Sequence, residues 1–441
     1  MKTKAFIYFM GILLSIIATG CKLVHTDSLD EKIAKAVDLR KLPSEENRTA
    51  LFSSPNWLME RSQRNSKRIR NLENFLPTIG IDQGNSLITD LHLNLDRKIG
   101  QQILSSSFHP TETSLDKLCI QKDLNGVIIL HKGQIIYEQY PDMQPDERHV
   151  QYSISKSYAG TIIAILADHG LLNESDLLQK HISELKDKPL GQVSINDVLR
   201  MASGINCREL SEGSFSEPDH NFYKFLQYRG IYPEPEGGFE QSLMEFFAEV
   251  GIVAPAGQTN DYTTANTAVL SILAERVSGE PYHSLISKYI WSKIGAEDEA
   301  RISLSNSGIA GSGGFVMSRL RDLARYGLAF TDDAPTKIAS DRYLEKIRTG
   351  DRDLLMTDEY VINMFEGQGF SHNSYQWDIV FEDGDFAKFG FGGQGLYISP
   401  DKRLVIAFYS ANKDESTDNM SLYYLSRKLA LFDRFKKNNP I

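Results

Sequence analysis

Ser153 and Lys156 are the first residues of this 441-residue chain whose types and spacing suggest chemistry. They stand three positions apart at the start of a run of Ile, Ala and Leu that ends at Asp168. This run predicts a buried helix, and residues at i and i+3 share one helical face. A lysine at the edge of an apolar core loses solvation, which favours the neutral amine. A neutral amine beside a hydroxyl can accept its proton, so the pair predicts a nucleophile.

The spacing alone is a weak signal, because Ser-x-x-Lys occurs five times in the chain. Only the copy at Ser153 introduces a long apolar helix. The alternative is that Ser153 simply caps a helix N-terminus. Partners elsewhere in the chain must decide between these interpretations.

Tyr262 is the next candidate, just before a helix predicted over residues 267–277. Pro255-Ala256-Gly257 predicts a turn that presents this tyrosine on a loop. A phenol can act as a base or proton relay when a nearby ammonium lowers its pKa. The alternative is an ordinary packing residue.

A glycine-rich segment supplies the third candidate, Ala387-Lys388-Phe389-Gly390-Phe391-Gly392-Gly393-Gln394-Gly395. Four glycines in six residues are unusual in a strand and are typical of a backbone that approaches a ligand closely. A strand edge there can direct an amide N–H at a developing oxyanion. A β-bulge or a tight hairpin is the structural alternative.

The helices and strands that must position these residues can be predicted from the sequence, and together they indicate an α+β fold. A hairpin is expected over residues 126–131 and 134–140, and helices over 195–201, 241–250, 267–277 and 318–330. Strands are expected over 375–381, 386–389, 396–398 and 403–409, with a closing helix over 419–435. We therefore expect one antiparallel sheet built from both chain ends and flanked by helices, with a mostly helical region inserted.

Composition narrows the class further. Hydrophobic residues at 41% and charged residues at 24% are ordinary globular values, and a net charge of −10 argues against nucleic-acid binding. The chain contains no His-Glu-x-x-His and no phosphate-binding glycine loop, so neither a metal nor another cofactor is expected.

The N-terminus has the pattern of a targeting segment. Lys2 and Lys4 precede an apolar stretch over residues 5–18, which ends in Ala18-Thr19-Gly20-Cys21. This end resembles the bacterial lipoprotein signal, so we expect a signal peptide over 1–20, a lipidated Cys21, a tether over 21–55 and the folded domain over 56–441. The protein is then exported and lipid-anchored to a membrane of the cell envelope. Ordinary secretory cleavage and a retained anchor are the alternatives.

Cys119 and Cys207 remain after that segment. They either form one disulfide or stay as buried free thiols, and the sequence leaves this open.

Ser-x-x-Lys, the tyrosine loop and the glycine-rich strand occur here in the order found in the serine β-lactamase and penicillin-binding-protein superfamily. The chain resembles that superfamily from about Trp57 to its C-terminus, in the class C-like esterase branch, and within it is most similar to the 6-aminohexanoate-dimer hydrolases. Four further landmarks match in order: residues 133–138, 194–204, 314–326 and 375–377.

The resemblance implies roles for individual residues. Ser153 would be the acylated nucleophile, Lys156 its proton partner and Tyr262 the motif tyrosine. The usual Tyr-x-Asn is replaced by a Tyr-x-Thr-x-Asn form, which implies substrate contacts from Thr264 and Asn266.

The family's Lys-Thr-Gly strand has two possible registers. In the preferred one, Lys388-Phe389-Gly390 occupies it and the Phe391 amide joins that of Ser153 as an oxyanion donor. The competing register, Phe391-Gly392-Gly393, shifts the donor to Gln394. Both lack the hydroxyl that helps to bind a β-lactam carboxylate, so efficient β-lactamase action is not expected.

The sequence thus predicts a serine hydrolase that cleaves a small amide or ester through a covalent acyl-Ser153 intermediate. A D-amino-acid peptidase or transpeptidase acting on peptidoglycan is one alternative. A non-catalytic ligand sensor that retains the fold is another. The substrate and the oligomeric state stay open.

Overall fold

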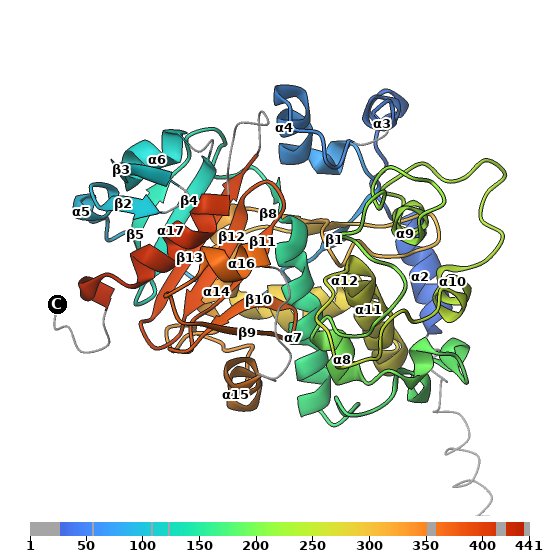
Figure 1. The fold of residues 1–441 in the computed structure, drawn as a ribbon. Coiled ribbons are helices and arrows are strands. Elements are labelled where there is room, and N and C mark those ends of the chain that lie inside the picture. The colour runs from blue at the N-terminus through green and yellow to red at the C-terminus, as the bar shows by residue number, and fades with distance from the viewer. Residues whose placement is uncertain are drawn as a thin grey trace, which may run out of the picture.

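A seven-stranded antiparallel sheet forms the centre of the protein in this computed structural model, which describes residues 27–54, 57–106, 109–121, 124–350, 359–411 and 420–435 (Figure 1). Its strand order is β5-β4-β13-β12-β11-β10-β9. The strands are β4 (Leu124–His131), β5 (Gln134–Gln139), β9 (Phe370–Ser374), β10 (Trp377–Phe381), β11 (Phe386–Gly390), β12 (Gln394–Ser399) and β13 (Leu404–Ser410). The predicted α+β fold, with one sheet from both chain ends, is confirmed.

Both faces of this sheet are buried, because successive side chains of a strand point to opposite sides. On β4, Ile128 and Leu130 belong to one hydrophobic core, whereas Val127 and Ile129 belong to the other. The first core contains α7 (Ser155–Asp168) and α14 (Leu320–Leu328). The second contains α6 (Leu115–Gln121) and α17 (Met420–Ala430).

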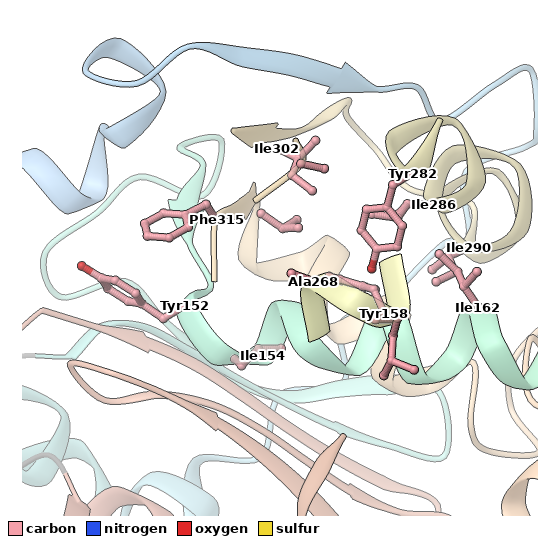
Figure 2. Packing of buried hydrophobic residues seen from close by; sticks show 14 of the residues in the cluster. Tyr152, Ile154, Tyr158, Ile162, Ala268, Tyr282, Ile286, Ile290, Ile302 and Phe315 are labelled. Carbon is pink, nitrogen blue, oxygen red and sulfur yellow. The ribbon is translucent and has the colours of Figure 1, made fainter. Parts of the chain in front are cut away.

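Helix α7 lies between the sheet and the inserted helical region (Figure 1). That region contains α8 (Ile195–Leu199), α9 (Asn221–Tyr228), α10 (Leu243–Glu249), α11 (Thr264–Ser278) and α12 (Tyr282–Ile286). Figure 2 shows Tyr158 of α7 facing Tyr282, and Ile162 facing Ile290. Because α7 is apolar on nearly every side, it is buried almost throughout.

A second sheet, β1-β7-β8-β6, holds the chain that leads into α7. Its strands are β1 (Thr78–Ile81), β6 (His149–Val150), β7 (Ala300–Ser303) and β8 (Val316–Ser318). The pairing of β6 with β8 continues at Gln151, whose N–H donates to the Val316 carbonyl at 2.9 Å. These short strands were not predicted, since two to four residues are too few for a periodic pattern.

The N-terminal part differs from the predicted tether over residues 21–55. Two helices, α2 (Leu29–Asp38) and α3 (Glu45–Phe52), lie against the body and precede α4 (Gln63–Arg70). Lys32 Nζ donates to the Gly279 carbonyl at 2.9 Å, and Arg40 Nη1 donates to the Ser305 carbonyl at 2.8 Å. The polar composition of residues 21–55 predicted a tether, because contacts from charged side chains to backbone carbonyls leave no hydrophobic pattern in the sequence. The predicted signal peptide and Cys21 lie outside the described residues.

The start of β10, the two cysteines and the helix lengths also bear on what the sequence predicted. The strand expected from residue 375 begins instead with a turn, because Tyr375 and Gln376 have φ values of 47° and 68° and join β9 to β10. Cys119 and Cys207 are both buried free thiols. Within the described ranges, every helix is too short or too polar to span a bilayer.

Candidate active site

Ser153 sits in a 3-10 turn, η2 (Tyr152–Ile154), immediately before α7. It does not cap the helix, because Ile154 is the N-cap residue of α7 and no side chain bonds that end. Tyr152 has a left-handed φ of 44°, which re-aims the chain just before the serine. Gln151 anchors the turn through its side chain, which donates to Ser318 Oγ at 2.8 Å. The turn is therefore shaped to present Ser153 and not to start a helix.

Lys156 lies against this serine. Its Nζ is 2.9 Å from Ser153 Oγ and donates to the Gly313 carbonyl at 2.7 Å. The side chain is completely buried, and this burial is the main cause that lowers the pKa of Lys156 to about 7. Near neutral pH about half of the Lys156 side chains are then uncharged, with a lone pair available to the serine proton.

Tyr262 lies between two lysines. Its ring centroid is 4.9 Å from Lys156 Nζ and 5.2 Å from Lys388 Nζ. Burial nevertheless raises the pKa of Tyr262 well above its ordinary value, and the carboxylates of Asp378 and Glu209 act in the same direction. A hydrogen bond with Ser153 opposes this shift without reversing it. The condition under which this phenol would act as a base, a pKa lowered by an ammonium, is therefore not met, and Tyr262 stays protonated as a hydrogen-bond donor.

The glycine of β11 brings the strand against the nucleophile turn. A Cβ added at Gly390 would lie 2.5 Å from the Gln151 carbonyl oxygen, so a side chain there would push the strand away. The partner of this close approach is backbone and not a ligand. Gly392 and Gly393, with φ of 80° and 92°, form the tight turn into β12. The hairpin alternative thus accounts for these two glycines.

The geometry favours one register of the Lys-Thr-Gly-like strand. Phe391 lines the same cavity as Ser153. Gln394, whose backbone amide is the donor in the competing register, lies in β12 and is not among the residues that line this cavity. The segment beside the nucleophile is therefore Lys388-Phe389-Gly390.

Lys388 is buried with Asp378 of β10 as its partner. The Asp378 carboxylate pairs with Lys388 Nζ and accepts the Phe389 N–H at 3.1 Å. Burial is the largest effect on the ammonium and lowers the pKa of Lys388, which Asp378 partly restores. A paired carboxylate is what makes a buried lysine tolerable.

Thr264 and Asn266, which stand two and four positions after Tyr262, take different positions in the structure. The N–H and Oγ1 of Thr264 both donate to Glu209 Oε2 at 2.6 Å, and Thr264 lines the cavity. Asn266 is buried behind it, where its Oδ1 accepts from Ser203 Oγ at 2.6 Å. Asn266 is not among the residues that line the cavity, so the structure does not bring it to the predicted substrate contact.

One cavity of about 520 Å³ unites these groups. Of the predicted site residues it is lined by Ser153, Lys156, Tyr262, Thr264, Gly390 and Phe391. Besides Phe391, its apolar lining consists of Leu58, Met59, Leu210, Phe215, Phe222, Leu226, Phe315, Met364, Phe365, Ile379 and Phe389. The shape and lining fit a small, largely apolar organic substrate.

The sequence did not single out four of the site's polar groups, namely Glu209, Arg229, Gly313 and Asp378. Asp378 follows the landmark at residues 375–377 directly and was within reach of sequence reasoning. The other three lie in loops or at a helix end, with no spacing that relates them to Ser153.

The sequence model of the Beta-lactamase family matches residues 120–431, which include every polar group of the site described above. The chain belongs to the Beta-lactamase family. It is 28% identical over 319 residues to the 6-aminohexanoate-dimer hydrolase of Paenarthrobacter ureafaciens, covering 71% of this chain and 78% of that protein. The predicted resemblance to this superfamily and to these hydrolases is thereby confirmed.

Solved structures show the same fold in this Beta-lactamase-family protein and its neighbours. The putative 6-aminohexanoate-dimer hydrolase from Bacillus anthracis superimposes with a TM-score of 0.67 at 21% identity, covering 89% of this chain and 98% of that one. The Beta-lactamase/D-alanine carboxypeptidase from Yersinia pestis gives a TM-score of 0.53 at 15% identity, covering 71% and 96%.

Proposed function

We propose that this Beta-lactamase-family protein is a serine hydrolase that cleaves an amide or ester through a covalent acyl-Ser153 intermediate. One observation carries the proposal: Lys156 Nζ is fully buried and 2.9 Å from Ser153 Oγ. Burial lowers the pKa of Lys156 to about 7, so a substantial fraction of the amine is a base at neutral pH.

Acylation then begins with a proton transfer from Ser153 Oγ to the neutral amine of Lys156. The Gly313 carbonyl accepts one amine N–H at 2.7 Å, which orients the lone pair of Nζ toward the serine. Ser153 Oγ forms a bond to the substrate carbonyl carbon, and the carbonyl oxygen gains the negative charge. The amides of Ser153 and Phe391 are the proposed donors to that oxygen, each contributing about 3–4 kcal/mol as in comparable sites.

Tyr262 supplies the path for the proton to the leaving group. Its phenol stays protonated and is hydrogen-bonded to Ser153, so it can donate one proton while receiving another from Lys156. The leaving amine or alcohol departs with that proton. Water attacks the acyl-enzyme by the reverse relay, which releases the acid and restores Ser153.

The cavity favours simple amides and esters over β-lactams. Phe389 occupies the place of the family's hydroxyl residue, and its ring stacks on Tyr423 with centroids 3.9 Å apart. No hydroxyl is therefore available at this position to bind a β-lactam carboxylate.

A fluorophosphonate probe tests the proposal, because an activated serine displaces its fluoride and becomes phosphonylated, whereas an unactivated serine reacts far more slowly. We expect rapid labelling that peptide mapping assigns to Ser153, and no labelling of Ser153→Ala. Ser183→Ala, in another Ser-x-x-Lys copy, is the matched control and should label like the wild type. If Ser153→Ala takes up probe as fast as the unmodified protein, the proposed function is refuted.

We also propose that the protein is exported and anchored through a lipid on Cys21. The support is Lys2 and Lys4, the apolar stretch over residues 5–18 and the small residues before the cysteine. Metabolic labelling with a fatty-acid analogue should mark the wild-type protein and not Cys21→Ser. Equal labelling of both would contradict this proposal.

A further inference from the structure

An extended segment, residues 92–96, lies along β5 at one edge of the central sheet (Figure 1). Leu93 forms a bridge with Ile135 of β5 in the parallel sense. The Ile135 N–H donates to the His92 carbonyl at 2.9 Å, and the Asn94 N–H donates to the Ile135 carbonyl at 2.9 Å. The segment therefore adds a further short strand to that edge of the sheet.

The backbone groups of Leu93 and Leu95 point away from β5. The N–H groups of Asn94 and Asp96 both donate to carbonyls of β5, and in an extended chain the groups of alternate residues point to opposite sides. The N–H and carbonyl groups of Leu93 and Leu95 have no backbone hydrogen-bond partner among the described residues. Residues 92–95 are all exposed, so these donors and acceptors are open to solvent.

Apolar side chains accompany this open edge. Leu93 and Leu95 are 62% and 59% exposed. Sheets usually protect an open edge with lysine or proline, but the segment His-Leu-Asn-Leu-Asp contains neither. The opposite edge of the sheet is different, because three of the five residues of β9 are buried. An exposed apolar edge of this kind is typical of a surface to which another strand is added.

Two copies of this segment fit each other. Identical edges related by a two-fold axis pair in the antiparallel sense, and the outward-facing residues must pair with one another. Within the segment, the axis can therefore pass through Leu93, Asn94 or Leu95. An axis at Asn94 pairs Leu93 with the partner's Leu95, and it places His92 opposite the partner's Asp96. Apolar side chains then meet each other, and a histidine meets a carboxylate.

The other two positions of the axis are less favourable. An axis at Leu93 places Asp90 opposite the partner's Asp96, and like charges directly opposite each other are destabilising. An axis at Leu95 places Leu93 opposite the partner's Arg97, which separates the leucines from one another. The sequence of the segment thus selects one register.

We propose that the protein forms a two-fold symmetric dimer by antiparallel pairing of residues 92–96, with the axis at Asn94. Leu93 donates a hydrogen bond to the partner's Leu95 and accepts one from it. The segment precedes residues 120–431, so it lies outside the part of the chain that the family model matches. None of its residues lines the cavity of Ser153, so the dimer does not depend on the proposed hydrolase function.

Sedimentation equilibrium over a series of protein concentrations tests for the dimer. We expect the wild type to dimerise reversibly, and Leu93→Lys/Leu95→Lys to dimerise at least about tenfold more weakly, because lysines then face each other across the axis. Leu39→Lys, at an exposed leucine that follows α2, is the matched control and should dimerise like the wild type. A wild type that is monomeric at about 100 μM, or a dimer that is unchanged in the double variant, would overturn the proposal.

Disulfide trapping tests the register. In the proposed dimer, Asn94 faces the partner's Asn94 at a position without backbone hydrogen bonds, where the two Cα atoms lie about 4.5 Å apart, within the span of a disulfide. Oxidised Asn94→Cys should therefore become a covalent dimer, whereas Leu93→Cys and the wild type should not. Cross-linking of Leu93→Cys in preference to Asn94→Cys would overturn the proposal.

A proline variant separates the interface from the fold. Leu95→Pro removes only an outward-facing N–H and keeps the bonds from the segment to β5, so it should weaken the dimer about tenfold without lowering the melting temperature. Fluorophosphonate should label Ser153 in this variant as fast as in the wild type. If Leu95→Pro dimerises as tightly as the wild type, the proposal fails, whatever the labelling of Ser153 shows.

Discussion

The pH dependence of hydrolysis follows directly from the burial of Lys156. With a pKa of about 7, Lys156 is neutral in about half of the molecules at pH 7 and in about one tenth at pH 6. An exposed lysine with a pKa of 10.5 would be neutral in only about one molecule in three thousand at pH 7. Since the base must be neutral, kcat/KM should rise about tenfold per pH unit below 7 and level off above it.

The assay is the hydrolysis of a neutral p-nitrophenyl ester between pH 5 and 9, because kcat/KM reports groups of the free enzyme. Lys156→Met should lower kcat/KM by about 10²–10⁴-fold and remove the acidic limb. If kcat/KM of Lys156→Met still rises with pH below 7, Lys156 is not the base. A wild-type rise in kcat/KM that is half complete only near pH 10 would also refute this assignment.

Two neighbouring charges provide a directional test of the same reasoning. Glu209 raises the pKa of Lys156, so Glu209→Gln should move the midpoint to lower pH. Arg229 lowers that pKa, so Arg229→Met should move it to higher pH. Glu212→Gln, an exposed carboxylate on the same loop, is the control and should leave the midpoint in place. Shifts of both test variants in one direction would contradict the electrostatic explanation.

Four further predictions follow. Tyr262→Phe should lower kcat about 10²–10⁴-fold, and the wild type should show no alkaline decline up to pH 10, because burial keeps the phenol protonated in pH–rate measurements. Gly390→Ala should lower kcat/KM about 100-fold by displacing β11 from Gln151, whereas Gly80→Ala, whose methyl group meets only the side chain of Glu299, should not. Lys156→Met should raise the free energy of unfolding in urea by up to about 5 kcal/mol at pH 6, where the folded wild type carries the buried ammonium, and this gain should vanish as the pH rises to 10.5. Limited proteolysis of the native protein should spare residues 29–52, which form α2 and α3; rapid cleavage there would restore the tether.

The sequence predicted those parts of the fold whose signals are local. The hairpin around Lys132-Gly133 has β-branched strands and a two-residue turn, and both residues adopt the positive φ that such a turn requires. Helix α7 follows from a continuous apolar run. The helices α2 and α3 were missed because they are short and polar, and because Lys32 of α2 and the following Arg40 contact residues more than 200 positions away.

The candidate site residues Ser153, Lys156 and Gly390 could be selected from the sequence for a different reason, because each is marked by its immediate neighbours. Ser153 and Lys156 stand three positions apart at the start of an apolar run. The glycines of residues 390–395 indicate that the strand ends at Gly390 in a close approach or a turn. Asn266 was misplaced because a motif gives spacing but not the direction of a side chain. It stands two positions beyond Thr264 on α11, and its side chain is directed toward Ser203.

From the sequence we predicted that burial favours the neutral amine of Lys156, and burial is the largest cause of its lowered pKa, but the effects of the neighbouring charges could not be predicted. The state of Lys156 is set by its burial and by Glu209, Lys388, Asp378 and Arg229. These groups come from separate loops and strands, so their effects exist only after folding. The same burial that makes the amine a base prevents the phenol of Tyr262 from becoming one. A low-dielectric site favours the uncharged form of both groups, which for a lysine means a base and for a tyrosine means an acid. The proposed roles, a base for Lys156 and a proton donor for Tyr262, therefore both follow from the burial of these side chains beside Ser153.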